Sequence, residues 1–331
     1  MLPPAASPED LSERYFQEAM QKKNSSYVTM FTLSGLNESI TNKYIYFSFT
    51  LLGYLFIMFV NLTLIIIIAL EKTLHEPMYF FLCNLSANAL YGTAGFYPKL
   101  LFDFLSDTHV ISYSGCLLQI FVIYSFSTCE LSNLTVMACD RYVAICRPLE
   151  YHTIMSPLTT SKLILFSWIF SFSCLCFAIL LTISLPLCGS HIDKLYCDNW
   201  SIVKLSCVGT TVNNGYGYVI ICIFFAHFLF ILFSYMKILS VCRASSIAMS
   251  KCLQTCLPHL LMVINYFIAV FFDIMYSKYG SSDIPQVLHY LLSLEFLIVP
   301  PVFSPIIYGL NLKKIREKFT RICSRNKVIH A

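Results

Sequence analysis

The chain has 331 residues, of which 57% are hydrophobic and only 12% are charged, with a formal net charge of +4. A soluble protein of this length carries about twice that share of charged residues, so the composition excludes an ordinary soluble globular domain. Most of the 15 cysteines lie within apolar runs, where small buried hydrophobic side chains are expected. The sequence therefore predicts an integral membrane protein.

The N-terminal segment, residues 1–43, is polar and lacks a short apolar core followed by a small-residue cleavage site. We expect it to be retained, extracellular and partly disordered. Asn24 and Asn37 stand in N-x-S triplets and are its predicted glycosylation sites, and Asn199 is a further acceptor triplet in a later loop.

Seven segments are apolar over roughly the 20 residues that a transmembrane helix needs. They lie at about 44–70, 78–102, 113–139, 162–186, 215–241, 253–276 and 286–309. The predicted fold class is an all-α membrane protein, with a seven-transmembrane helix bundle over residues 44–310.

Basic residues set the expected orientation, because they are enriched on the cytoplasmic side of membrane helices. They concentrate in the loop at 141–162, in the connection at 237–251 and in the tail at 311–331, which we therefore place inside. The N-terminus is then outside. The tail segment "LKKIREKFTRI" has one apolar face with basic residues around it, which predicts a short amphipathic helix on the inner membrane surface.

Four cysteines fall outside the membrane in this topology, where an oxidising compartment favours disulfides. They are Cys116 at the head of the third span and Cys188, Cys197 and Cys207 in the loop after the fourth. Four cysteines allow three pairings, and the spacing does not choose among them.

The third span ends in "MACDRYVAIC" at 137–146, with the charged Asp140 and Arg141 side by side. This stretch resembles the signature of rhodopsin-like (class A) G-protein-coupled receptors and, more narrowly, the MAYDRYVAIC of vertebrate odorant receptors. Further similar segments follow the order of that family. They are "VTMFTLSGL" at 28–36, "LHEPMYFFLCNLS" at 74–86, "SYMKIL" at 234–239, "KCLQTCLPHL" at 251–260 and "PPVFSPIIYGL" at 300–310.

The resemblance implies a receptor in the plasma membrane, in the cilia of olfactory sensory neurons. Such a receptor binds a small-molecule odorant between its helices and activates a stimulatory, olfactory-type heterotrimeric G protein, which raises cyclic AMP. The resemblance also implies the disulfides Cys116–Cys197 and Cys188–Cys207. It implies membrane lipid as a further partner, and neither a cofactor nor nucleic acid. A non-olfactory, metabolite-sensing receptor of the same class is the alternative, because the sequence does not reveal the tissue.

Arg141 stands where such a bundle can open. Its guanidinium can donate to Asp140 in one state and to a bound partner in another, which makes a two-state element. Alternatively, Arg141 is a snorkelling interfacial charge, and His259 is a structural histidine rather than a latch near Arg141. The G-protein switch that the resemblance implies comprises Asp140, Arg141, Tyr142, Tyr235, His259 and Tyr308.

The ligand cavity expected from the resemblance has an apolar lining with a few hydroxyls, as is usual for small organic ligands. Ordinary helix packing is the alternative explanation for the same stripes of residues. The expected lining residues are Tyr124, Ser127, Thr128, Val219, Ile220, Ile223, Phe267, Val270, Phe271, Ile274 and Leu297.

Acidic residues within the spans are rare and usually face an interior cavity. Odorant receptors commonly pair a glutamate at the position of Glu130 with an aspartate of the second span around a cation, but this chain has Ala89 there, beside Asn88. We favour a neutral Glu130, stabilised by burial, over a sodium ion held with polar neighbours. Glu295 and Asp273 could each contact an amine-bearing ligand or pair with a neighbour.

Other classes of membrane protein lack support in the sequence. There is no HExxH metal site or GxSxG nucleophile, and residues 286–309 contain no lysine for a retinal Schiff base. A transporter would show inverted repeats with interrupted spans in both halves, whereas the prolines here cluster in the last two helices. We therefore predict a receptor and not an enzyme.

Overall fold

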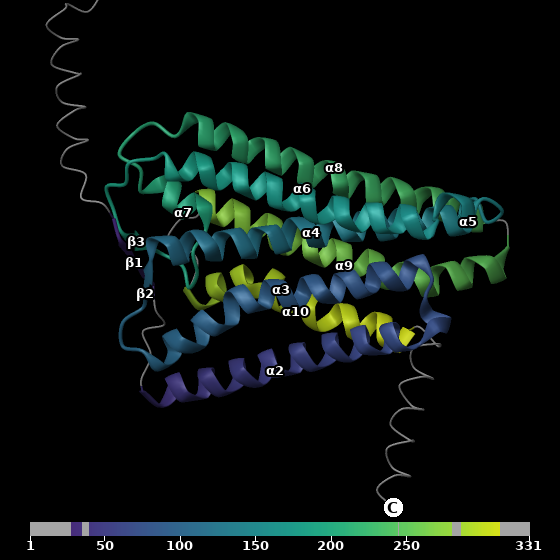
Figure 1. Ribbon diagram of the computed structural model, residues 1–331, viewed down its shortest axis with the longest axis horizontal. Coiled ribbons are helices and arrows are strands. Elements are labelled where there is room, and N and C mark those ends of the chain that lie inside the picture. Colours follow the sequence, from purple (N-terminus) through teal and green to yellow (C-terminus); the bar gives the residue numbers. More distant parts are fainter. Residues whose placement is uncertain (1–27, 35–39, 244, 280–285, 312–331) are drawn as a thin grey trace, which may run out of the picture.

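The computed structural model describes residues 28–34, 40–243, 245–279 and 286–311. Within these residues, seven long helices lie side by side in a bundle (Figure 1). They are α2 (Ile40–Leu70), α3 (Pro77–Leu105), α4 (Tyr113–Cys146), α6 (Pro157–Ile183), α8 (Thr211–Cys242), α9 (Ser246–Tyr279) and α10 (Gln286–Asn311). Each predicted span overlaps one of these helices. The predicted glycosylation sites Asn24 and Asn37 and the amphipathic tail from residue 312 onward lie outside the described residues.

Short elements cover the two ends of the bundle. One end, which we name the α5 end, carries α5 (Tyr151–Ile154) and the 3₁₀ helix η1 (Lys72–Leu74). The other, which we name the strand end, carries α7 (Asn199–Lys204), β1 (Met30–Leu33), β2 (Val110–Ser112) and β3 (His191–Ile192) (Figure 1).

β1 is the central strand of the sheet at the strand end. It pairs antiparallel with β2, where Met30 lies opposite Ser112, and parallel with β3, where Thr32 lies opposite His191. The sequence did not predict this strand in the N-terminal segment, because its partners come from two loops far along the chain. The segment just before the first long helix is therefore fixed across the end of the bundle.

Five stretches of helix are long and apolar enough to cross a membrane. They are Asn42–Leu70, Tyr113–Cys146, Pro157–Ile183, Thr211–Cys242 and Cys252–Lys278. A shorter apolar stretch, Leu294–Ile307, lies in α10, and α3 is more polar because its buried face includes Asn84, Ser86 and Asn88. The prediction of a helical membrane bundle is thus supported, with five of the seven predicted spans clearly long and apolar enough.

α6 shows most plainly that the bundle is surrounded by lipid. Its buried residues are Thr160, Ser167, Ser171, Leu175 and Thr182, four of which carry hydroxyls. Its exposed face instead carries large apolar side chains, among them Leu165, Phe166, Ile169 and Leu180. The hydroxyls of Ser167 and Ser171 donate to carbonyl oxygens four residues earlier, at 3.0 and 2.7 Å. A helix that hides hydroxyls and exposes leucines is suited to a hydrocarbon environment.

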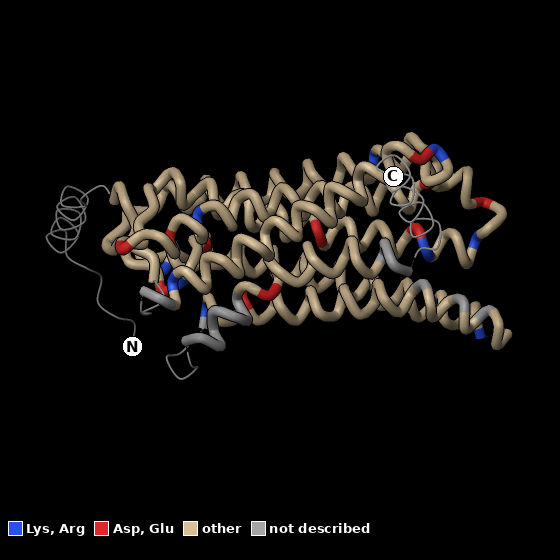
Figure 2. The backbone as a smooth tube through the Cα atoms, turned by 90° about the horizontal axis from the view of Figure 1, so that it is seen from below, with Lys and Arg blue, Asp and Glu red and all other residues tan. Residues whose placement is uncertain are grey.

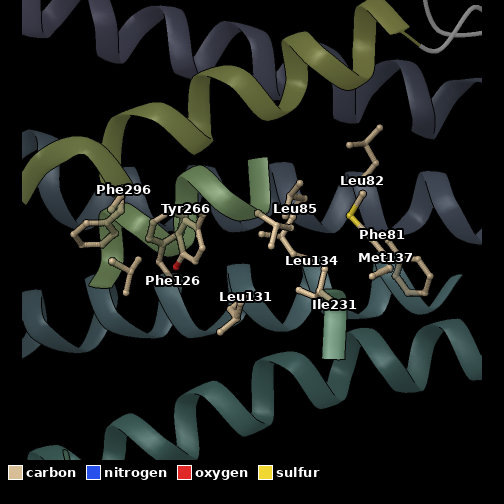
Figure 3. Close-up of a cluster of buried hydrophobic side chains, with 14 of the residues drawn as sticks. Phe81, Leu82, Leu85, Phe126, Leu131, Leu134, Met137, Ile231, Tyr266 and Phe296 are labelled. Atoms are coloured by element: carbon tan, nitrogen blue, oxygen red, sulfur yellow. The ribbon is translucent and has the colours of Figure 1, made fainter. Parts of the chain in front are cut away.

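Charged residues gather at the two ends of the bundle, and the middle nearly lacks them (Figure 2). The middle is filled by the apolar core. Figure 3 shows Phe126, Leu134 and Met137 of α4 packed with Phe81, Leu82 and Leu85 of α3 and Ile231 of α8. α4 lies at the centre of the bundle, in contact with α3, α6 and α8.

Asparagine side chains link the helices within this apolar middle. Pro305 has no N–H, so the carbonyl of Pro301, four residues earlier in α10, lacks its usual helical partner. The amide Nδ2 of Asn61 in α2 donates to that carbonyl at 2.8 Å. Similarly, Asn84 of α3 donates to Asn133 Oδ1 of α4 at 2.6 Å, and Trp168 of α6 donates to Asn84 Oδ1 at 2.8 Å.

α3 approaches α4 closely because of two glycines. A Cβ atom built at Gly92 would collide with the ring of Phe126, and one at Gly95 would collide with Val122. At Gly53 of α2, by contrast, no heavy atom lies within 4 Å of such a Cβ. Small residues at helix contacts allow this kind of close packing in membranes.

We predict that Gly92→Ala lowers the free energy of unfolding by about 1–3 kcal/mol through overpacking against Phe126. This loss should appear although alanine is the better helix former. Gly53→Ala is the matched control and should leave stability unchanged or slightly higher. The measurement is thermal unfolding of the purified full-length variants in one detergent. Equal stability of the two variants would contradict this account of the α3–α4 contact.

Candidate functional site

Two disulfides shape the loop that follows α6 at the strand end. Cys116 at the start of α4 is joined to Cys197, with Cα atoms 5.5 Å apart, and Cys188 is joined to Cys207, with Cα atoms 5.3 Å apart. These are the two pairs that the family resemblance implied. A small apolar cluster surrounds the first disulfide and consists mainly of Phe31, Leu33, Ile111, Ile120, Ile192 and Ile202. The loop is therefore anchored to α4 and to β1.

A buried charge cluster ties the same loop to α9. Lys194 Nζ lies 2.7 Å from Asp273 Oδ1 of α9 and 3.6 Å from Asp198 Oδ2. Tyr196 Oη donates to Asp273 Oδ1 at 2.8 Å, and all four residues are 3% exposed or less. Of the two alternatives for Asp273, a ligand contact or a neighbouring partner, the structure favours the partner.

Lys194 keeps its positive charge in this cluster. Burial lowers its pKa, but the negative charges of Asp198 and Asp273 raise it by more, so its pKa lies above the ordinary value. One ammonium faces two carboxyl groups in this cluster. Asp198 receives further hydrogen bonds from the backbone N–H of Ser201, at 2.9 Å, and from its hydroxyl, at 2.5 Å. Lys194 was not among the predicted site residues, because only the folded loop reveals its partners.

Next to this cluster, a cavity opens between α4, α6, α7 and α8, and Ile274 of α9 completes its wall. It encloses about 680 Å³ of space, part of which is open to solvent. α4 contributes Tyr124 and Thr128, and α7 contributes Asn199 and Trp200. The remaining lining residues are Cys174, Leu175, Ala178 and Leu181 of α6 and Asn213, Tyr216, Gly217, Ile220 and Ile221 of α8. The mostly apolar lining suits a small organic molecule.

The structure brings four of the expected lining residues to this cavity, namely Tyr124, Thr128, Ile220 and Ile274. Ser127 instead contacts Tyr266, whose hydroxyl lies 2.6 Å from Ser127 Oγ. The other expected residues lie elsewhere. Val270 and Leu297 are buried in the bundle core, Phe267 stacks on Phe224 and Phe228, Ile223 is half-buried on α8, and Val219 and Phe271 are exposed.

Sequence analysis placed none of the α6 residues in the cavity. α6 is almost uniformly apolar apart from its hydroxyls, so its inward face has no strong signal in the sequence. The weak signal was the spacing of Ser167, Ser171 and Thr182, which marks the face that turns away from lipid. α7 was missed as well, because its six residues fall in a loop between cysteines.

Glu130 lies in the middle of the bundle and is only 2% exposed. Asn88 Nδ2 donates to Glu130 Oε2 at 2.9 Å and to the carbonyl of Phe126 at 3.0 Å. The amide nitrogen of Asn88, and not its oxygen, therefore faces Glu130. A sodium ion would need oxygen ligands here, whereas the amide presents N–H donors. The Asn88 contact thus supports a Glu130 without a bound cation, which stays a prediction. Glu295 lies half-buried in α10.

At the α5 end, no hydrogen bond or salt bridge joins Asp140 to Arg141 within the described residues. Asp140 is buried and accepts a hydrogen bond from Tyr151 Oη of α5 at 2.9 Å. Arg141 is half-buried, and its Nη2 contacts the sulfur of Met78. In this state α5 supplies a competing donor to Asp140, and the two-state role of Asp140 and Arg141 stays a prediction.

The remaining switch residues lie on neighbouring helices at the same end. Tyr235 Oη of α8 lies 2.7 Å from His259 Nδ1 of α9, and both side chains are buried. Tyr142 is half-buried against the core. Tyr308 belongs to α10, and its side chain lies outside the described residues. The structure thus links α8 to α9 beside the end of α4.

Comparison with known proteins adds the family. The family model described as "Olfactory receptor" matches residues 49–326. Human olfactory receptor 4K5 is 35% identical over 312 residues, which cover 92% of this chain and 93% of that protein. Human olfactory receptor 52J3 is 37% identical over 278 residues, which cover 80% and 86%. The same extent of similarity is found for human olfactory receptor 6N1, which is 35% identical over 311 residues. This chain belongs to the olfactory receptor family.

Proposed function

We propose that the chain is an odorant receptor that binds a small organic ligand in the cavity beside Tyr124 and signals through the α5 end. The supporting observation is that the cavity and Arg141 lie on the same central helix, α4. Tyr124 and Arg141 are separated by about 25 Å along it, at 1.5 Å per residue. A ligand and a cytoplasmic partner can therefore act on one element from opposite sides of a membrane.

The proposed topology has seven spans, with the strand end outside and the α5 end inside the plasma membrane of olfactory neuron cilia. The disulfides at the strand end support this orientation, because an oxidising compartment lies outside the cell. The basic connections near the α5 end support it as well. Olfactory receptors are G-protein-coupled receptors and not enzymes, and the proposed partner is a stimulatory, olfactory-type G protein that raises cyclic AMP.

The proposed mechanism uses the different strengths of the contacts at the two ends of the bundle. At the strand end, a charge-assisted hydrogen bond joins Asp273 to Lys194. At the α5 end, the hydrogen bond of Arg141 within the described residues goes to the thioether of Met78, which is a weak acceptor. A ligand that contacts Ile274, next to Asp273, shifts α9 relative to α4. The guanidinium of Arg141 then exchanges its weak partner for stronger acceptors on the G protein.

We predict that Arg141→Ala abolishes the cyclic AMP response to pooled volatile and amino-acid-like odorants, because the G protein loses its guanidinium partner. The assay uses cells that express the full chain with the olfactory G protein, at matched surface expression. Arg147→Ala is the control, since that exposed arginine lies 3.8 Å from Glu150 in a surface pair that contributes little. Its response should equal that of the wild type. An unchanged response of Arg141→Ala would refute the proposed switch.

We further predict that sodium has no effect on odorant potency, because Asn88 donates to Glu130 where a cation would need oxygen ligands. Replacing extracellular sodium by a large organic cation should leave the half-maximal odorant concentration unchanged in wild type and in Glu130→Gln. The test uses pools that give a response in the assay above. A sodium dependence that disappears in Glu130→Gln would show that a sodium site exists after all.

A further inference from the structure

The hydroxyl groups that line the cavity all donate their protons to other groups of the protein. Tyr124 Oη donates to Asp273 Oδ2 at 3.5 Å, Thr128 Oγ1 donates to the carbonyl of Tyr124 at 2.9 Å, and Tyr216 Oη donates to the carbonyl of Cys174 at 2.8 Å. A hydroxyl has one proton to donate and two lone pairs that accept. Because each of the three protons is directed to the protein, each oxygen has only lone pairs left for a ligand.

The buried charge cluster strengthens this polarity at Tyr124. Asp273 lies behind the Tyr124 hydroxyl, within a group of one ammonium and two carboxyl groups. In a buried site, a hydrogen bond to a carboxylate polarises the donor oxygen and makes it a better acceptor for the next bond. None of the described residues that line the cavity carries a charge of its own.

Donor groups of the lining lie at one side of the cavity. They are the amides of Asn199 and Asn213 and the indole of Trp200, all from α7 or the first turn of α8. Asn199 Oδ1 already accepts from Thr182 at 2.8 Å, so its amino group is the part left for other partners. The side formed by α4 therefore accepts hydrogen bonds, and the side formed by α7 donates them.

From this arrangement we propose that the cavity selects uncharged, apolar molecules that carry a hydroxyl group, that is, aliphatic alcohols or phenols. The ligand hydroxyl donates to Tyr124 Oη and extends the chain of bonds that ends at Asp273. Ethers and aldehydes of the same size bind less well, because their oxygens can accept from the α7 side but cannot donate to Tyr124 or Thr128. Carboxylates bind less well for the same reason, because the ionised group has no proton to donate to Tyr124 Oη. This inference rests on the proposed function only in taking the cavity as the ligand site.

Trp200 provides a binding signal that does not depend on a G protein. The chain has two tryptophans, Trp168 and Trp200, and only the latter is in the cavity lining. In a Trp168→Phe background, the emission of Trp200 reports occupancy of the cavity in the purified full chain in lipid nanodiscs. The probes are two isomeric pairs, hexanol against methyl pentyl ether and para-ethylphenol against para-methylanisole, with hexanal and hexanoate as further comparisons.

We expect each hydroxyl probe to half-saturate the emission change at a concentration about five- to ten-fold lower than its isomeric ether, as one added hydrogen bond predicts. In Tyr124→Phe the ratio should fall to about two-fold or less, because the main acceptor is gone. Tyr196→Phe is the matched control. It also removes a hydroxyl bonded to Asp273, but Tyr196 is not part of the cavity lining, so the ratio should persist.

Equal or tighter binding of the ethers in the wild type, or a ratio that survives Tyr124→Phe, would overturn the inference. The absence of any emission change with all probes would also overturn it, because the cavity would then not be a small-molecule site. Failure of the proposed function gives a different result. Trp200 emission would rank the probes as expected, whereas cells that express the chain would show no cyclic AMP response to the hydroxyl probes.

Discussion

A polar group inside a lipid-embedded bundle cannot bond to water, so it needs a partner within the protein. This constraint explains most of the polar contacts in this chain. Ser167 and Ser171 bond to their own helix, and Asn61 serves the carbonyl that Pro305 leaves without a partner. Asn88 serves Glu130 in the same way. Each of these bonds satisfies a buried group and also fixes the position of a helix.

The strand end shows the same constraint acting on full charges. Lys194 and Asp273 are buried where an isolated ion would be costly, and each is stable there because the other is present. The pair joins a loop to α9, and the Cys116–Cys197 disulfide joins that loop to α4. The loop is thus attached to both α4 and α9, and its short helix α7 lines part of the cavity.

The sequence was sufficient for features that depend on local composition or on a matched motif. Apolar runs located the long helices, because a membrane helix needs a run of about 20 such residues. The motif around Arg141 located the α5 end of α4. The sequence was insufficient where a contact joins a loop to a distant helix. Lys194 meets Asp273, and Tyr151 meets Asp140, only after the loops have folded. The α6 wall of the cavity was missed because α6 offers little polar contrast along its length.

The sheet at the strand end also determines the order in which the receptor can be completed during synthesis. Thr32 of β1 donates to the carbonyl of Ser190, which the ribosome adds 158 residues later. β1 therefore lacks this partner until the fourth long helix and the loop after it have been synthesised. The same loop delivers Cys197 to Cys116. The β1–β3 pairing and the Cys116–Cys197 disulfide thus form late in biogenesis. An error in any of the first four long helices leaves β1 without β3. Such a chain would present an unpaired strand and free thiols to the quality-control machinery of the secretory pathway.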